Sequence, residues 1–450
     1  MNDYAPLVRE SLELDFPPVS ERDEIIRSLA QPEMFNLVHI ITGMRRSGKT
    51  FYLFQKIKQL LEAGVARDRI FYFNFSDDRL KPIAATLASD IVETYYRLVP
   101  QARTSGAYFF FDEVQELPDW QGFCQRLAEH EKITLTITGS SSKLSSEEIA
   151  TQFRGRSHAH ELLPLSFKEF CRFNGEEIPT HAGDRDASFS QRSATRLSAN
   201  YDAFLIKGGF PGVQKLVDED RIEILQSYVR DVVARDVVDR FGKNDISLAH
   251  QFALFALRNS ACELSLNNLA KTLQDAGYTV YWEKLKQLST LFQQAYLYFP
   301  LNEYTTSLKP NSTAVPKAYA IDQGICHAVS RANQQDVGKR LETAVYLELR
   351  RRAAGSRLET LTSYTSRSAK KEKVDFLKGG ALADAPYALY QVCADMSNEK
   401  TRQREIASLS LAMTETGTPE GLILTLHESG EEHTDAGVIR ILPAWQWSLL

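Results

Sequence analysis

The stretch that decides the fold runs from residue 37 to 64 and reads LVHIITGMRRSGKTFYLFQKIKQLLEAG. Its first part, 37–42, is a short apolar run that predicts a buried strand. Its last part, 50–64, carries apolar residues at helical spacing and ends at a glycine that stops a helix. Between them lies GMRRSGKT, 43–50, which fits the phosphate-loop pattern G-x-x-x-x-G-K-[ST] in the strand-to-helix setting that this pattern requires.

Each residue type in this loop suits a triphosphate. Glycines let the backbone curl so that successive N–H groups point at phosphate oxygens, and the following helix adds the positive end of its dipole. Lys49 would reach the β- and γ-phosphates, and Thr50 would ligate Mg²⁺. The two arginines of the loop suit phosphate contact and solvent exposure equally. The predicted nucleotide-contacting residues are Gly43, Met44, Arg45, Arg46, Ser47, Gly48, Lys49, Thr50 and, further along the chain, Ser140.

A second element of the same chemistry is YFFFDEVQ, 108–115, an apolar strand that ends in two acids. A carboxylate at the C-terminal edge of such a strand can hold the Mg²⁺ shell, and we assign this role to Asp112. Glu113 is then the candidate general base that polarises the attacking water. Capping of the next helix is the alternative role of both acids, but the phosphate loop upstream favours catalysis.

The strand ITLTIT, 133–138, ends in small hydroxyl residues. Thr138, Ser140 or Ser141 could sense the γ-phosphate or the attacking water. A plain Gly-Ser turn explains the same residues nearly as well. This stretch alone therefore does not decide between a γ-phosphate sensor and a turn.

Arg154 and Arg156, in FRGRSHAH, are candidates for a finger that neutralises charge on the transferred phosphoryl group. Surface arginines are common, so a purely structural role is the alternative. His158 and His160 follow on a predicted strand, where their alternation puts them on one face. Because no Cys or third ligand stands nearby in the sequence, we expect a structural role for this pair.

The rest of the chain reads as several domains. Strand-like and helical stretches alternate from about 37 to 165, which indicates βαβ units around a mostly parallel sheet. The acidic N-terminal stretch contains one predicted helix, at 21–29, and the polar stretch 174–200 is predicted to be a loop or linker. The predicted organisation is a lead-in at 1–30, a P-loop ATPase domain at 31–173, a linker and helical lid at 174–244, a winged-helix-like module at 245–324 and an α/β domain at 325–450.

Composition excludes several classes of protein. The 450 residues are 43% hydrophobic and 25% charged, so the chain is neither disordered nor fibrous. A net charge of -5 argues against a globally basic nucleic-acid binder. The five cysteines form no CxxC pair, and the N-terminus lacks the apolar core of a signal peptide. The longest apolar runs fall far below the roughly 20 residues of a membrane helix. We expect a soluble cytoplasmic protein without a membrane partner.

Several motifs occur in an order that resembles a known family. They are GMRRSGKT, YFFFDEVQELPDW, TITGSSSKL, GGFPG at 208–212, YVRDVVARDVV at 228–238 and KAYAIDQGI at 317–325. The chain resembles the prokaryotic AAA-type ATPases that end in a poorly characterised domain with a PD-(D/E)xK-nuclease-like core. The resemblance covers residues from about 20 to 450. It implies an α/β P-loop sheet of the AAA/ASCE type, a winged-helix module and a restriction-nuclease-like domain, with ATP rather than GTP as the nucleotide.

The C-terminal domain contains partial counterparts of the residues that a nuclease site uses. Such a site needs carboxylates that converge on Mg²⁺ and a lysine that stabilises developing charge. The positions that correspond in this sequence are Glu342, Asp375, Gln391 and Cys393. An amide thus replaces one carboxylate, and a thiol replaces the lysine, although Lys373 or Lys400 could take over that role. We therefore favour an inactive fold used for contacts over an active nuclease.

Partners other than ATP stay open. Residues 331–378 contain 12 Lys/Arg and 6 Asp/Glu, an excess that could follow a DNA backbone or simply form a solvated surface. The presumed recognition helix, YWEKLKQLSTL, has only Lys284 and Lys286 against Glu283, so the winged helix argues weakly for DNA. A protein partner or a second copy of the chain is equally open.

The leading hypothesis is a Mg²⁺-dependent protein that binds and slowly hydrolyses ATP. Its nucleotide state would reposition the winged-helix and C-terminal domains. The alternatives are a DNA-binding regulator or scaffold in which ATP is a structural ligand, and an ATP-gated DNA nuclease.

Overall fold

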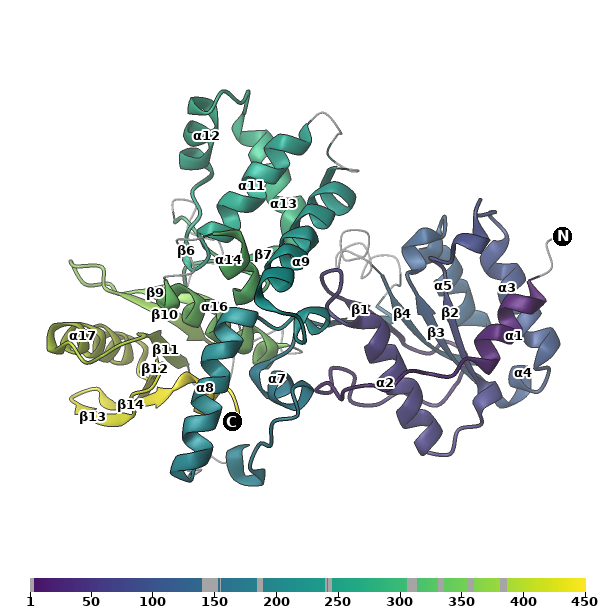
Figure 1. Ribbon diagram of the computed structural model, residues 1–450, viewed down its shortest axis with the longest axis horizontal. Helices are drawn as coiled ribbons and strands as arrows, with labels where there is room; N and C mark the ends of the chain where they lie inside the picture. The colour runs from purple at the N-terminus through teal and green to yellow at the C-terminus, as the bar shows by residue number, and fades with distance from the viewer. Residues whose placement is uncertain are drawn as a thin grey trace. The chain divides into compact units, whose positions relative to one another are not determined.

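Figure 1 presents the computed structural model of the chain. The structure describes residues 4–139, 153, 155–183, 189–238, 241, 245–305, 314–330, 336–354, 360–380 and 387–450. The chain divides into two compact units, Met1–Leu162 and Leu163–Leu450. Each unit contains a hydrophobic core of its own. In the part of the chain that is described, no helix combines the length and the apolar character needed to cross a membrane.

The N-terminal unit is built on a five-stranded sheet in the order β2-β3-β4-β1-β5, and every neighbouring pair is parallel. In this order β4 lies between the strand that precedes the phosphate loop and the strand that ends in Asp112. Ligands of such sheets bind at the C-terminal edge where the strand order reverses, which here is the end of β1. The strands are β1 (Val38–Thr42), β2 (Ile70–Asn74), β3 (Ala107–Asp112), β4 (Ile133–Thr138) and β5 (Ser157–Glu161).

Helices cover both faces of this sheet (Figure 1). Successive side chains of a strand point to opposite faces. Ile41 and Phe110 accordingly pack with α2 in one cluster, whereas Ile40 and Phe109 pack with α1, α3 and α5 in another. The predicted α/β sheet is therefore confirmed. The helices are α1 (Ala5–Glu13), α2 (Lys49–Glu62), α3 (Leu87–Leu98), α4 (Ala102–Ser105) and α5 (Trp120–His130).

The helix predicted at 21–29 is wrong, because these residues form no helix. Their backbone groups bond elsewhere: the N–H groups of Ile25 and Ile26 donate to the Tyr52 hydroxyl, at 3.1 and 3.0 Å. Buried backbone groups need a partner, and here α2 supplies it in place of a helical turn. Local apolar spacing cannot reveal such a tertiary substitution.

The C-terminal unit begins with helices. The expected linker at 174–200 is wrong in its second half, because α8 starts at Gln191 after the N-cap Ser190 and buries Leu197. Helix α9 ends at Asp231, and the chain continues directly as a π-helical stretch. These elements are α7 (Phe167–Phe173), α8 (Gln191–Lys207), α9 (Asp218–Asp231) and the π-helical Val232–Val238.

Three helices and a three-stranded sheet follow in the chain. The sheet has the order β6-β8-β7 with antiparallel neighbours, and its first strand was not expected from the sequence. Helix α14 then leads out of the module. The elements are α11 (Ile246–Arg258), β6 (Cys262–Glu263), α12 (Leu266–Asp275), α13 (Trp282–Gln294), β7 (Tyr298–Leu301), β8 (Lys317–Ala320) and α14 (Gln323–Val329).

The last part of the chain is a six-stranded mixed sheet in the order β13-β14-β12-β11-β10-β9, whose strands are labelled in Figure 1. Strands β9, β10 and β11 are antiparallel to one another, and α17 connects β11 to the parallel β12. Strands β13 and β14 add an edge that the sequence did not predict. The elements are α16 (Val337–Ala353), β9 (Leu361–Thr365), β10 (Lys373–Lys378), β11 (Ala388–Val392), α17 (Glu399–Thr416), β12 (Glu420–Thr425), β13 (Gly430–Thr434), β14 (Gly437–Pro443) and α18 (Ala444–Trp447).

Two motifs that lie far apart in the sequence meet inside this unit. The turn GGFPG, 208–212, contacts the start of α14, where the Gly209 N–H donates to Asp322 Oδ2 at 2.6 Å. Gly208 has a φ of 73°, and a Cβ at this position would lie 2.1 Å from Asp322 Oδ1. Glycine is therefore required at position 208 by both the backbone and the space.

Candidate active site

The phosphate loop follows β1 and leads into α2, as the sequence predicts. Gly43 has a φ of 151°, and an added Cβ would lie 2.3 Å from the backbone oxygen of Leu162. Gly48 has a φ of 103° and is the N-cap of α2. The two glycines of the motif thus stand where a side chain would strain or block the backbone.

Lys49 lies against this loop. Its ammonium group donates to the backbone oxygens of Gly43, at 3.0 Å, and Met44, at 3.1 Å. The side chain is buried, with 6% of the residue exposed. The cation is therefore held within the curve of the loop, where the pattern places the lysine that contacts phosphate.

Asp112 is the centre of a hydroxyl cluster at the end of β3. Thr50 donates to Asp112 Oδ2 at 2.7 Å, Tyr72 donates to the same oxygen at 3.2 Å, and Thr138 donates to Oδ1. Burial raises the pKa of Asp112 above its usual range, and the hydrogen bonds from Thr138 and Thr50 oppose the shift. This carboxylate would be stabilised in its charged form by a nearby divalent cation.

These residues fit Mg²⁺ and a triphosphate. Mg²⁺ prefers oxygen ligands. Asp112 offers a carboxylate oxygen and Thr50 a hydroxyl oxygen, and the two oxygens are joined by a hydrogen bond. The Ser47 hydroxyl, inside the phosphate loop, is buried and has no hydrogen-bond partner among the residues that the structure describes. A buried hydroxyl of this kind is satisfied when it donates to a phosphate oxygen.

Glu113 directly follows β3 in a left-handed conformation, with φ 55° and ψ 42°. Its backbone N–H donates to Thr138 Oγ1 at 3.4 Å, and its carboxylate accepts from Gln115. Non-glycine residues adopt this conformation at some cost, and such positions concentrate at functional sites. The structure thus brings the candidate general base to the same end of the sheet as Asp112.

Arg156 does not lie at the phosphate loop. Its backbone oxygen accepts from the N–H of Val38, at 2.9 Å, so it stands at the start of β5 and β1, whereas the phosphate loop follows the end of β1. Its guanidinium group pairs with Glu129 at 3.4 Å and covers the ring of Phe35. The structure therefore does not bring Arg156 to the phosphate loop of its own chain. The other candidates from these stretches, Arg154, Ser140 and Ser141, lie outside the described residues.

Arg22 is a residue of this site that the sequence did not reveal. Its guanidinium group donates to the backbone oxygen of Ser47 at 3.0 Å, and its N–H donates to Gln55 of α2 at 2.7 Å. Arg22 is 7% exposed although it lies in the polar lead-in. No local pattern marks it, because its partners are more than 20 residues away in the chain.

A second cluster of charged residues lies in the C-terminal unit. Lys317 of β8 donates to Glu342 Oε1 of α16 and to Asp375 Oδ1 of β10, each at 2.8 Å. Tyr319 also donates to Glu342 Oε1, at 2.7 Å. Strand β10 has a register shift between Val374 and Leu377, which is the stretch that contains Asp375. The two predicted acids are thus brought together, with a lysine that the sequence did not single out between them.

Gln391 joins this cluster, but Cys393 does not. Gln391 Oε1 accepts from the N–H of Asp375 at 3.2 Å, and its amide donates to Glu405 of α17 at 2.8 Å. The thiol of Cys393 donates instead to the backbone oxygen of Asp395, at 3.3 Å. The lysine that contacts the two acids is therefore Lys317 rather than a residue at the position of the thiol.

The electrostatics of the cluster reflect its burial. Burial and the neighbouring Asp375 raise the pKa of Glu342 to about 7, against the attraction of Lys317. Burial lowers the pKa of Lys317, but the two carboxylates outweigh this effect and raise it above its ordinary value. Lys317 thus stays a cation and supplies the positive charge that the paired carboxylates require.

The basic stretch 331–378 is partly used for internal contacts. Arg351 donates to the backbone oxygen of Pro164 at 2.6 Å, and Arg352 donates to that of Trp447 at 2.8 Å. The guanidinium group of Arg350 lies over a phenylalanine ring, 3.9 Å from its centroid. The side chains of these three arginines make contacts within the protein. They therefore do not contribute to a continuous basic surface that could bind DNA.

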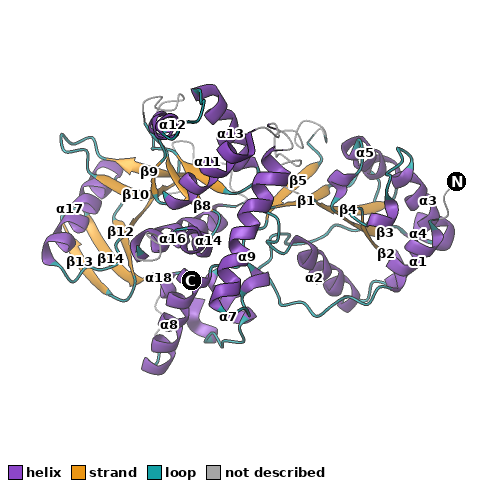
Figure 2. Cartoon of the chain, turned by 45° about the horizontal axis from the view of Figure 1, so that its top comes forward, coloured by secondary structure: helices purple, strands orange, loops and turns teal. Residues whose placement is uncertain are grey.

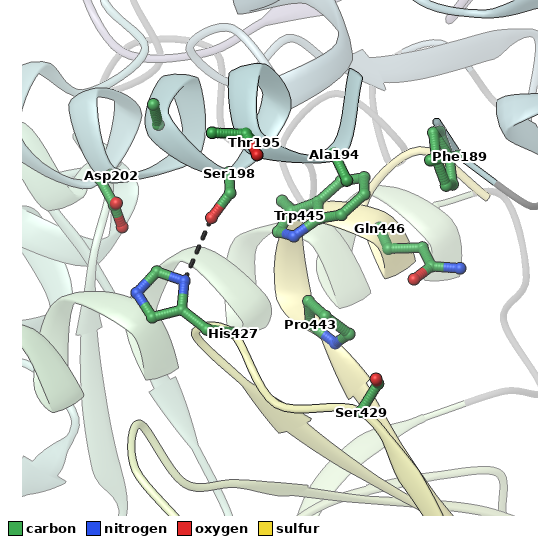
Figure 3. Close-up of a pocket in the computed structure, with 11 residues that line it drawn as sticks. Phe189, Ala194, Thr195, Ser198, Asp202, His427, Ser429, Pro443, Trp445 and Gln446 are labelled. Carbon is green, nitrogen blue, oxygen red and sulfur yellow. Dashed lines mark hydrogen bonds between the residues drawn. The ribbon is translucent and has the colours of Figure 1, made fainter. Parts of the chain in front are cut away.

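A further pocket of about 600 Å³ lies in the C-terminal unit (Figure 3). The Oγ atom of Ser198, on α8, lies 3.1 Å from the Nδ1 atom of His427. Asp202 lies one helical turn further along α8. The sequence gave no sign of this pocket, because its residues come from segments far apart in the chain. Its lining consists of Phe189, Ala194, Thr195, Ser198, Ala199, Asp202, His427, Ser429, Pro443, Trp445 and Gln446.

Comparison with known proteins defines the class. Residues 36–171 match the family described as AAA domain, and residues 198–336 match a family described only as a domain of unknown function. With the parallel sheet and the phosphate loop, this makes the N-terminal unit an AAA-type P-loop ATPase domain. An uncharacterized protein of Methanocaldococcus jannaschii is 31% identical over 449 residues, which cover 98% of this chain and 95% of that protein. The chain belongs to the family of this archaeal protein.

Other relatives are more distant. An uncharacterized protein of Haemophilus influenzae is 28% identical over 333 residues, which cover 74% of this chain and 78% of that protein. A Walker-type ATPase of Pyrococcus abyssi superposes with a TM-score of 0.38 and 12% identity, over 65% of this chain and 90% of its own. The Aeropyrum pernix ORC1 protein, solved in complex with DNA, superposes with a TM-score of 0.27 and 12% identity. The superposition covers 68% of this chain and 88% of the ORC1 chain.

Proposed function

We propose that this protein is a cytoplasmic, Mg²⁺-dependent ATPase whose nucleotide state repositions its C-terminal domains. The hydrogen bond between Thr50 and Asp112 carries the proposal. It joins the last residue of the phosphate loop to the carboxylate at the end of β3, and these are the two groups that hold Mg²⁺ in P-loop ATPases.

The roles of the residues follow from their positions. Lys49 would move its ammonium group from the loop carbonyls to the phosphate oxygens, where its charge offsets the negative charge that develops there. Asp112 and Thr50 would hold the Mg²⁺ ion, which as a Lewis acid polarises the phosphoryl oxygens. Glu113 would accept a proton from the attacking water. Thr138 would orient Asp112 through the hydrogen bond that it donates.

Two substitutions test this proposal. Lys49→Ala should abolish ATP binding measured by calorimetry, and Glu113→Gln should keep binding but lower the hydrolysis rate by at least 100-fold. Lys58→Ala is the matched control, since Lys58 is an exposed lysine on the same helix α2. Hydrolysis by both variants at the wild-type rate would refute the assignment.

For the C-terminal domain we propose a restriction-nuclease-like fold that is inactive. The order α16, β9, β10, β11, α17 and β12 supports this fold, and the ion pairs of Lys317 with Glu342 and Asp375 support the inactivity. A lysine between two carboxylates occupies the space that a catalytic Mg²⁺ needs. Incubation of DNA with Mg²⁺ or Mn²⁺, with and without ATP, should give no cleavage. Cleavage that requires ATP and is lost in Asp375→Ala would instead establish an ATP-gated nuclease.

A DNA-binding regulator with ATP as a structural ligand is the second candidate. The observation that favours it is the succession α11, β6, α12, α13, β7 and β8, which suits a winged helix. The exposed Tyr281 and Trp282 at the start of α13 could contact a base or a protein. A gel shift that weakens with salt and ignores nucleotide would favour DNA binding. A gel shift that depends on ATP would favour the first proposal, a Mg²⁺-dependent ATPase.

A further inference from the structure

We propose that the N-terminal unit contains a zinc-class metal site formed by His39 of β1 together with His158 and His160 of β5. A potential ligand nitrogen from each ring lies within 4.8 Å of the other two. The sequence identified the pair on β5 but offered no third ligand. The parallel pairing of β5 with β1 supplies it, since these two strands lie side by side (Figure 2). In their register, His39 is aligned with His158 and Ile41 with His160.

The geometry is close to that of a bound ion. His39 Nδ1 and His160 Nε2 are 3.1 Å apart. Two nitrogens on a tetrahedral zinc ion, each at about 2.0–2.1 Å from the metal, lie about 3.3 Å from one another. The ring of His158 lies 4.1 Å from that of His160, centroid to centroid, and its ligand nitrogen lies within 4.8 Å of the other two.

The surroundings also suit a metal ligand. His39 and His160 are buried, with 6% and 7% exposed, whereas His158 is exposed and leaves a coordination position open to solvent. His160 also makes a hydrogen bond with the backbone of Ile25. Ligating histidines commonly use their second ring nitrogen in this way, which fixes the ring and its tautomer.

The donor set selects the class of ion. Three neutral imidazoles suit Zn²⁺, Co²⁺, Ni²⁺ or Cu²⁺, whereas Mg²⁺ and Ca²⁺ prefer oxygen ligands. Lys56, a cation near the cluster, is itself paired with Glu24, which offsets its repulsion of a metal ion. Three protein ligands and one open position form the arrangement of an exchangeable site rather than a closed structural one.

This site would have a role separate from ATP hydrolysis. A metal ion here would join the edge strand β5 to β1, the strand that leads directly into the phosphate loop. It would also join β5 to the lead-in segment through the contact of His160 with Ile25.

Cobalt titration tests the site. The full chain, free of any histidine tag and stripped with EDTA, is titrated with Co²⁺ while the visible d–d absorption is recorded. We expect about one Co²⁺ per chain with the intense bands of four-coordinate cobalt, displacement by Zn²⁺ and no displacement by Mg²⁺.

Two variants make the result specific. His158→Ala removes an exposed ring and should leave the fold intact while it weakens Co²⁺ binding by tenfold or more. His130→Ala removes an exposed histidine at the end of α5 and should bind Co²⁺ like the wild type. Weak octahedral absorption in the wild type, or equal affinity in His158→Ala, would overturn the proposal.

Discussion

Replacing Lys317 by Met removes the cation that lies between two buried carboxylates. Lys317 Nζ is 2.8 Å from an oxygen of Glu342 and 2.8 Å from one of Asp375, and the side chains of these acids are 15% and 12% exposed. At an effective dielectric constant of about 20, each contact corresponds to roughly 6 kcal/mol of attraction before desolvation. Burying the three charges consumes much of this energy, so loss of the lysine should lower the free energy of unfolding by about 3–5 kcal/mol.

The pH dependence of this loss has a definite sign. Glu342 has a pKa of about 7 in the folded protein, above the ordinary 4.5. For a carboxyl with a raised pKa, the stabilising contribution is complete below the unfolded value and is lost as pH rises through about 7. Without Lys317 this pKa rises further, because the neighbouring positive charge is gone. The deficit of Lys317→Met should therefore be largest at pH 8 and shrink at pH 5, where Glu342 takes up a proton.

Urea denaturation followed by tryptophan fluorescence measures this deficit, since the C-terminal unit contains Trp282, Trp445 and Trp447. Lys373→Met is the matched control. Lys373 pairs with Glu263 on the surface, with side chains 60% and 50% exposed, and its loss should cost less than about 1 kcal/mol. Equal stability of the two variants, or a deficit at pH 5 as large as at pH 8, would refute the assignment of Lys317 as the counter-ion.

Three further substitutions probe other parts of the molecule. Gly208→Ala should lower the free energy of unfolding by more than about 2 kcal/mol, because its Cβ would lie 2.1 Å from Asp322 Oδ1. Gly277→Ala should cost about 1 kcal/mol, because none of the described residues lies within 4 Å of the added Cβ. Urea titrations that rank the two variants equally would contradict this. Arg22→Gln should weaken ATP binding about tenfold in calorimetry, since the guanidinium group that holds the phosphate loop is lost; an unchanged Kd would speak against it. Asp112→Asn should abolish the dependence of ATP affinity on Mg²⁺, and a preserved dependence would remove Asp112 from the metal site.

The relatives do not add a biochemical activity to these arguments. The archaeal protein that spans 98% of this chain is itself uncharacterized. The tests of Lys49 and Lys317 address separate units of the molecule, so one can fail without the other. The Lys49 test addresses ATP binding, and the Lys317 test addresses the counter-ion of the two buried carboxylates.

The sequence alone determined the parts whose signal is local. The phosphate loop requires consecutive residues, and its glycines have the backbone angles that the pattern implies. Asp112 ends an apolar strand and Glu113 follows it directly, so the sequence predicted their position at the end of the sheet. Glu342, Asp375 and Gln391 were identified through the resemblance to a PD-(D/E)xK-nuclease-like core, which assigns each of them to a particular helix or strand.

Tertiary structure decided the contacts between distant segments. Lys317 reaches two acids that follow it by 25 and 58 residues, and Arg22 reaches Ser47 across 25 residues. His39 meets His160 across 121 residues, because a parallel sheet aligns strands that the sequence separates. Periodicity describes which face of an element is buried, but it contains no information on which other element covers that face. Only the fold could therefore supply the third histidine and the counter-ion lysine.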